Sequence, residues 1–153
     1  SNVTAGIGRG QLLHLEEHKK LKKAIYARYR EAFQDIGEIR LNALNPDGDD
    51  NCWLTCMTIR EGCGVTPDQV MDALEAENIE TRPIWKPMHL QPVFEQCDFV
   101  TGEGFQSDFP TGQTIKSVSG DIFARGLCLP SDIKNTKEDM EKIIGIVRGV
   151  FGR

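Results

Sequence analysis

The chain of 153 residues carries 23 acidic and 18 basic residues, which gives a formal net charge of −5. Hydrophobic residues make up 39% of the chain, a globular composition that excludes a disordered or fibrous protein. The acidic balance argues against a nucleic-acid partner, and no apolar run reaches the ~20 residues that a membrane span requires. We therefore expect one cytoplasmic domain without a nucleic-acid or membrane partner.

The first thirty-odd residues are predicted to be helical. Leu21, Ile25, Tyr29 and Phe33 recur at every fourth position, and Gly37 is expected to end the helix. Three glycines near the start (residues 6, 8 and 10) do not complete a phosphate-binding G-x-G-x-x-G pattern. We expect them to allow close packing of this helix on another backbone.

Two short strands are predicted at residues 38–44 and 52–59, joined by a turn at 45–51. The second strand is apolar at both alternating sets of positions, so both faces of this part of the sheet are expected to be covered. The five cysteines are Cys52, Cys56, Cys63, Cys97 and Cys128. Their odd number and the lack of a C-x-x-C pair favour reduced thiols over a disulfide framework or a zinc cluster.

Further elements follow in the second half of the chain. Thr66 and Gln69 form a capping-box pattern that predicts a helix running to about Asn78, with Val70 and Leu74 inward. The pattern then predicts a strand at 79–85, a loop at 98–113, a helix at 118–125, a strand at 127–130 and a final helix from Asn135/Thr136. The sequence therefore indicates an α/β fold, with helices packed on a short, largely antiparallel sheet.

One motif raises a metal-site hypothesis. His14, Glu17 and His18 match the H-x-x-E-H pattern of inverted zincins, in which two histidines on one helix face share a zinc ion. No third ligand is specified, and the neighbouring leucines are typical of an ordinary amphipathic helix. We therefore expect no metal here, and a zinc hydrolase remains only an alternative.

Residues 80–92 concentrate polar and aromatic side chains between three prolines. Arg82 could hold a carboxylate or phosphate, Trp85 offers a flat apolar face for a ring, and His89 offers a hydrogen-bonding group. Lys86 adds a second cation. The alternative is a surface loop whose tryptophan belongs to the core. A ligand is most plausible at this segment.

Residues 81–94 (TRPIWKPMHLQPVF) resemble a segment of the DegT/DnrJ-type nucleotide-sugar aminotransferases. Three further stretches are similar to that family, namely residues 1–11 (SNVTAGIGRGQ), 123–131 (FARGLCLPS) and 136–147. They occur in the family's order and cover nearly the whole chain, and they are nearest to members acting in exopolysaccharide or cell-surface sugar synthesis.

This resemblance implies a pyridoxal-phosphate enzyme of the aspartate-aminotransferase fold type. Such an enzyme moves an amino group from glutamate to a keto-sugar carried on a nucleoside diphosphate, and we expect the parent to be a homodimer. Residues 1–153 correspond to its C-terminal small domain. The large domain with the Schiff-base lysine and the cofactor is absent, so we expect this chain alone to be inactive, to bind no pyridoxal phosphate and to self-associate through exposed apolar surface.

The resemblance also gives site residues. It places Arg82, Trp85, Lys86 and His89 on the substrate side of the cleft, and it places the segment that contains Ser1 and Asn2 near the domain junction. No residue of this chain is expected to be catalytic. The remaining alternative is a non-catalytic binding or interaction domain.

Overall fold

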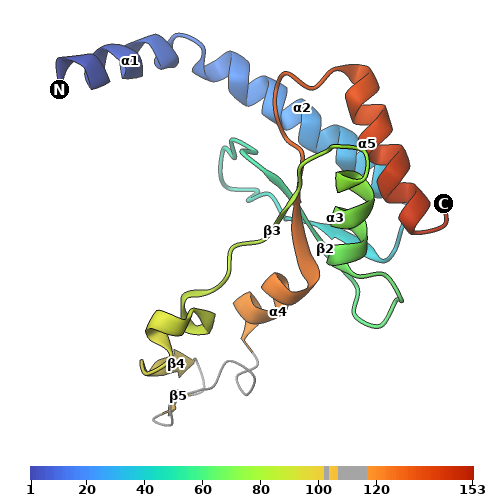
Figure 1. Cartoon of the computed structure of the whole chain (residues 1–153). Coiled ribbons are helices and arrows are strands. Elements are labelled where there is room, and N and C mark those ends of the chain that lie inside the picture. Colours follow the sequence, from blue (N-terminus) through green and yellow to red (C-terminus); the bar gives the residue numbers. More distant parts are fainter. Residues whose placement is uncertain (102–103, 107–116) are drawn as a thin grey trace.

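The computed structural model describes residues 1–101, 104–106 and 117–153 of the chain. Figure 1 shows a helical arm leading into a body of helices and strands, with a smaller lobe below it. The helices are α1 (Asn2–Leu12), α2 (Leu15–Phe33), α3 (Pro67–Glu75), α4 (Val118–Arg125) and α5 (Lys137–Val150), with short 3₁₀ turns at Met88–Leu90 and Pro92–Phe94. The strands are β1 (Ile39–Leu41), β2 (Thr55–Ile59), β3 (Arg82–Pro83), β4 (Phe99–Thr101), β5 (Gly104–Gln106) and β6 (Gly126–Leu129).

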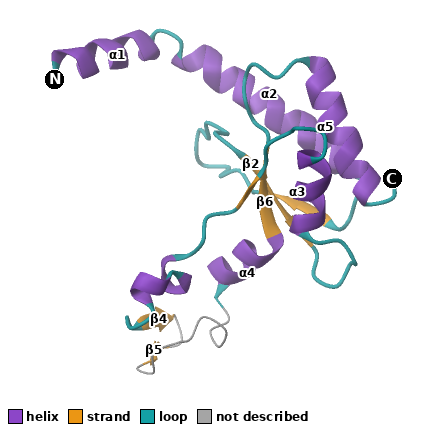
Figure 2. Cartoon of the chain, in the orientation of Figure 1, coloured by secondary structure: helices purple, strands orange, loops and turns teal. Residues whose placement is uncertain are grey.

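Four strands form the main sheet in the order β1-β2-β6-β3, and every neighbouring pair is antiparallel. In β2, Thr55, Met57 and Ile59 are buried, whereas the two residues between them are half-buried. The buried set packs with residues of α2, α3 and α5. These helices lie around the strands of the main sheet in Figure 2. The core comprises Tyr29, Phe33, Ile36, Met57, Ile59, Val70, Leu74, Leu127, Leu129, Met140, Ile143 and Val147.

The ends of the core helices are fixed by local polar contacts. The Thr66 hydroxyl accepts a hydrogen bond from the Gln69 N–H, and the Gln69 side chain accepts one from the Thr66 N–H. Thr136 and Asp139 form the same reciprocal arrangement at the start of α5. Each box satisfies backbone donors that a helix leaves unpaired, so both predicted helix starts are confirmed.

Helix α2 is joined to the last helix and to the sheet by long-range contacts. The Arg148 guanidinium donates to both carboxylate oxygens of Asp35, each at 2.7 Å, and to the Ala32 carbonyl at 2.6 Å. The buried Tyr29 hydroxyl donates to the Pro130 carbonyl at 2.7 Å. These contacts hold α2 against α5 and against the end of β6.

The structure confirms the fold class, but it corrects several element boundaries. The amino-terminal helical region is two helices, separated at Leu13 and His14, and α2 ends at Phe33, before Gly37. Strands β1, β2 and β3 are shorter than predicted, whereas β6 keeps its predicted length and begins one residue earlier. Only one set of β2 side chains is fully buried, because the other set faces a groove. The predicted 98–113 loop contains β4 and β5, while residues 102–103 and 107–116 lie outside the described residues.

Helix α1 extends away from the core (Figure 1), and none of its residues is buried. A Cβ atom built on Gly6, Gly8 or Gly10 would meet no neighbouring atom within 4 Å. The close packing predicted for these glycines is therefore not made with any described residue of the chain. Across the described residues, no helix is both long and apolar enough to cross a membrane.

Candidate functional site

The face of the sheet opposite the core carries a groove of about 730 Å³ between β1, β2 and α4. Cys56 and Thr58 contribute the half-buried set of β2 side chains, and Ile84 lines the groove from the segment after β3. The other lining residues include Arg40, Leu41, Asn42, Arg60, Val118, Asp121, Ile122 and Arg125. This open face lies next to the segment predicted to bind substrate.

Three arginines line the groove, and they differ in whether their guanidinium groups form ion pairs with described residues. Arg125 donates to the Asp121 carboxylate through two nitrogens and to the Ile59 carbonyl at 2.8 Å, and this contact lowers the pKa of Asp121. Arg60 pairs with Glu38 at 3.1 Å. Arg40 is exposed and makes no ion pair with any described residue, so its guanidinium is available to an anion in the groove.

Arg82 lies on the edge strand β3, where it is the register partner of Cys128 on β6. Its side chain is 77% exposed and forms an ion pair with Glu80. An exposed pair of this kind contributes only about 0–1 kcal/mol, so a bidentate anion could replace Glu80 at small cost.

Trp85 lies three residues after Arg82 and is 57% exposed, which rules out a core role for this tryptophan. Its ring is 5.8 Å from the ring of Trp53, with a 38° angle between the two planes, and Trp53 is 62% exposed. Two tilted, accessible indoles present apolar faces suited to a flat ring or to the carbon face of a sugar.

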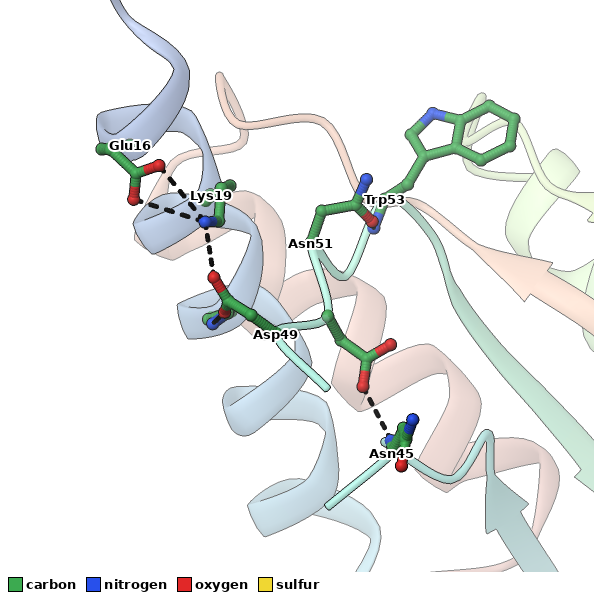
Figure 3. A network of polar contacts seen from close by, with 8 residues as sticks. Glu16, Lys19, Asn45, Asp49, Asn51 and Trp53 are labelled. Atoms are coloured by element: carbon green, nitrogen blue, oxygen red, sulfur yellow. Dashed lines mark hydrogen bonds and ion pairs between the residues drawn. The ribbon is translucent and has the colours of Figure 1, made fainter. Parts of the chain in front are cut away.

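The position of Trp53 is set by a polar network between α2 and the 45–53 loop (Figure 3). Lys19 donates to Asp49 at 2.7 Å and to Glu16, and Lys23 also pairs with Asp49. These two lysines lower the pKa of Asp49 to about 2, with Lys19 contributing more. Within the loop, Asn45 N–H donates to Asp50 at 2.7 Å and Trp53 N–H donates to Asn51 at 3.0 Å.

His89 lies in the 3₁₀ turn Met88–Leu90 and is half-buried. Its Nε2 atom is 3.0 Å from the hydroxyl of Ser117, which also caps α4 by accepting from the Gly120 N–H at 3.0 Å. The imidazole is therefore held against the start of α4. Lys86 is exposed, and its carbonyl accepts from the Gln91 amide at 3.2 Å.

The four predicted substrate residues thus lie along one exposed segment and do not enclose a pocket. Arg82, Trp85 and Lys86 are exposed, and His89 lies beside α4. Ser1 and Asn2 lie at the free end of α1, where the Ser1 hydroxyl caps the helix by accepting from the Thr4 N–H.

In the zincin-like pattern, His14 occupies the N-cap position of α2 and His18 lies in the first turn of that helix. His14 Nδ1 is 3.7 Å from Glu17, and the rings of His14 and His18 stack with centroids 6.0 Å apart. The described part of the chain contains no cluster of three or more His, Cys, Asp or Glu residues that could hold a metal ion. The arrangement resembles an exposed helix start, where Glu17 complements the helix dipole.

The antiparallel sheet, its helical cover and the exposed segment beside the groove place this chain in a known family. The sequence profile of the DegT/DnrJ/EryC1/StrS aminotransferase family matches residues 1–148. The chain belongs to this family, whose members are pyridoxal phosphate-dependent sugar aminotransferases.

Individual relatives agree with this assignment. The chain is 35% identical over 151 residues to EpsN of Bacillus subtilis (strain 168), which is assigned as a pyridoxal phosphate-dependent aminotransferase. The match covers 99% of this chain and 36% of EpsN. It is 30% identical over 155 residues to GDP-perosamine synthase of Caulobacter vibrioides, covering 99% and 37% of the two chains. A family aminotransferase from Brucella abortus superimposes with a TM-score of 0.72 and 25% identity, over 94% of this chain and 34% of that one. The chain thus spans about a third of the length of these relatives.

The described lysines do not fit a site for covalently held pyridoxal phosphate. A Schiff-base lysine needs an enclosed, desolvated pocket, and none of the described lysines is buried. Lys22 donates to two backbone carbonyls, and others are committed to ion pairs, namely Lys19 and Lys23 with Asp49, Lys137 with Glu141 and Lys142 with Glu77. Lys20, Lys86 and Lys134 are exposed.

Sequence reasoning did not identify Trp53, Ser117 or Arg40 as site residues. The predicted 52–59 strand includes Trp53, but the structure begins β2 at Thr55 and leaves Trp53 in the polar 45–53 loop. The run of turn-forming residues from Asn45 to Asn51 could have indicated its exposure. Arg40 lies on the groove because β1 pairs with β2, where Arg40 is the register partner of Thr58. A local sequence pattern does not predict the pairing of two separate strands.

Proposed function

We propose that this chain forms one wall of the substrate cleft in a pyridoxal phosphate-dependent nucleotide-sugar aminotransferase. The whole protein would transfer an amino group from glutamate to a keto-sugar linked to a nucleoside diphosphate, for a cell-surface polysaccharide. Residues 1–153 would be its C-terminal small domain, inactive by itself. Family membership and the match to about a third of each relative support this proposal.

The exposed pair Trp53–Trp85, in which Trp85 lies three residues after the exposed Arg82, is the observation that carries the proposal. A nucleotide-sugar combines flat or ring-shaped groups with a diphosphate, and this surface offers accessible indoles and an exposed guanidinium on neighbouring positions. In this arrangement Trp85 contacts a ring, Arg82 exchanges Glu80 for the anion, and Lys86 adds positive charge. His89, held by Ser117, supplies a polar contact.

The cofactor would be held by residues outside this chain, because the described lysines do not provide an enclosed site. The chain's own contribution is to bind and orient the substrate and to exclude water from one side of the cleft. Ser1 and Asn2 would lie where this domain joins the rest of the protein.

Kinetics of the full-length protein that contains this chain test the proposal. Trp85→Ala is expected to raise the KM for the nucleotide-sugar about 5- to 100-fold, since stacking on an aromatic side chain contributes about 1–3 kcal/mol. The exposed tryptophan makes no core contact, so the melting temperature should change little. Val93→Ala, on an exposed side chain of the same segment, is the matched control and should leave KM unchanged.

Unchanged kinetics in Trp85→Ala would remove this residue from the site. A full-length protein that carries the family's lysine motif but gives no amino transfer with any nucleotide-linked keto-sugar would instead favour a non-catalytic interaction domain.

A further inference from the structure

Two cysteines that the proposed function does not use face each other across the sheet. Cys56 on β2 and Cys128 on β6 are register partners, and their sulfur atoms are 3.7 Å apart. Both are free thiols. They come from positions 72 residues apart in the sequence, so only the folding of the sheet brings them together.

The backbone around Cys56 identifies the type of strand pair. The Cys56 N–H donates to the Asn42 side-chain oxygen at 2.9 Å, and the Cys56 carbonyl accepts from the Asn42 N–H at 2.9 Å. Both main-chain groups of Cys56 therefore point toward β1 and away from β6. Cys56 and Cys128 thus form a non-hydrogen-bonded antiparallel pair, in which the Cα atoms lie about 4.5 Å apart. Disulfides bridge Cα atoms about 4.4–6.8 Å apart, so the backbone need not move to join them.

The two thiols differ in access. Cys56 is half-buried and lines the groove on the open face, whereas Cys128 is only 7% exposed. The Cys128 thiol hydrogen bond to Cys56 lowers the pKa of the Cys56 thiol and raises that of Cys128. A small reagent that enters the groove therefore meets the more acidic thiol first.

We propose that Cys56 and Cys128 are a redox-modification site that forms a reversible cross-strand disulfide when the protein is exposed to a peroxide. The Cys56 sulfur attacks one peroxide oxygen, the O–O bond breaks, and the leaving hydroxide takes a proton to become water. The Cys128 sulfur then attacks the Cys56 sulfenic acid, the S–O bond breaks, and a second water leaves with the Cys128 proton. Two thiols lose two electrons and two protons to the peroxide, and a dithiol reverses the reaction.

The bridge would close a loop that contains the whole 80–92 segment. It would also join β2 to β6 directly beside Arg82, the register partner of Cys128. A cross-link over such a long loop restricts the unfolded chain, so the oxidised protein should melt at a higher temperature than the reduced one. This inference rests on the sheet geometry and is independent of the proposed function.

The test is peptide mapping of the 153-residue chain carrying Cys97→Ser, because Cys97 is exposed and would form bonds between molecules. After hydrogen peroxide treatment and before alkylation, the intact mass should fall by two hydrogen atoms, and alkylation should then add groups only to the remaining thiols, Cys52 and Cys63. Digestion should yield one cross-linked peptide that joins Cys56 to Cys128, and dithiothreitol should remove it. If both cysteines are alkylated after oxidation, or if the cross-link joins other cysteines, the proposal is wrong.

Variants separate the roles of the two thiols. With Cys128→Ser, a sulfenic acid trap such as dimedone should label Cys56, whereas Cys56→Ser should leave Cys128 unlabelled. Cys63→Ser is the matched control and should keep the cross-link, since Cys63 is half-buried like Cys56 but its thiol donates to the Val65 carbonyl and not to a second thiol. Dimedone labelling of Cys128 in Cys56→Ser, at the rate seen for Cys56, would overturn the assigned order of attack.

Discussion

At the scale of single residues, Asp49 joins the loop that leads to Trp53 to helix α2 through its two lysine partners. The lysines lie on α2, and Asp49 lies in the loop that leads to Trp53, so the carboxylate fixes the loop to the helix. Lys22 of the same helix donates to the Trp53 carbonyl at 3.1 Å. We therefore expect the Trp53–Trp85 pair to depend on the ion pairs that Asp49 makes with Lys19 and Lys23.

We expect Asp49→Ala to release the loop and weaken the Trp53–Trp85 contact. The near-ultraviolet circular dichroism of the tryptophan pair should fall toward that of Trp85→Ala, which lacks the pair. Asp47→Ala is the control, because Asp47 lies in the same loop and only its backbone N–H makes a contact there, to Asn45. A full tryptophan signal in Asp49→Ala would show that the loop holds Trp53 without the ion pairs.

The sequence predicted one half of this residue pair. Trp85 lies in the proline-rich segment that the sequence singles out for a ligand, but the residues alone leave a core tryptophan as an equal alternative, and only the structure shows that it is exposed. Trp53 falls within the predicted 52–59 strand, because that run is apolar at both alternating sets of positions, whereas β2 begins at Thr55. Its contact with Trp85 depends on β2 and β3 both pairing with β6, which is a property of the whole sheet.

At the scale of elements, the ends of α2 and α5 are joined by the Asp35–Arg148 pair. The Arg148 guanidinium, through its hydrogen bonds, lowers the pKa of Asp35 from 3.8 to about 2. A carboxyl whose pKa is lower in the folded state stabilises the protein above its unfolded pKa. This contribution is fully present above pH 3.8 and is lost as the pH falls toward 2.

We therefore expect the difference in urea midpoint between the unsubstituted protein and Asp35→Asn to shrink as the pH falls from 3.8 to 2. Asp72→Asn corrects for the loss of one negative charge, because Asp72 is exposed on α3 and makes no ion pair with a described residue. A difference that stays constant through this range would show that the Asp35–Arg148 pair does not couple the helices.

Helix starts were the elements that the sequence predicted best. Thr66 and Thr136 cap α3 and α5 because capping needs only residues within one turn of each other. The predicted 79–85 strand was reduced to Arg82–Pro83, since Pro83 cannot donate to a sheet and the segment then leaves β6. Local chemistry thus predicts where helices begin, whereas strand length depends on the partner strand.

At the scale of the whole molecule, the surface of helix α1 lacks a partner within the described chain. Helix α1 extends from the body with Val3, Ile7 and Leu12 exposed, and three glycines that each cost about 1 kcal/mol reduce its intrinsic stability. An isolated helix of 11 residues is marginal in water. We infer that α1 is stabilised by contact with the rest of the whole protein or with a second subunit.

Sedimentation velocity tests this account of the apolar surface. The 153-residue chain should associate as its concentration rises, because exposed apolar side chains gather on α1. Val3→Glu combined with Ile7→Glu should reduce association, while Thr4→Glu on the same helix should not. A monomer at every concentration that binds no apolar dye would contradict the prediction.

The central claim is that this chain shapes the substrate side of an aminotransferase whose cofactor is held elsewhere in the whole protein. Pyridoxal phosphate added to the 153-residue chain and to the full-length protein, followed by borohydride reduction and peptide mapping, tests it most directly. We predict one stoichiometric cofactor–lysine adduct in the full-length protein, at a lysine outside residues 1–153, and no specific adduct in the short chain. A stoichiometric adduct at a single lysine within residues 1–153 would contradict the claim.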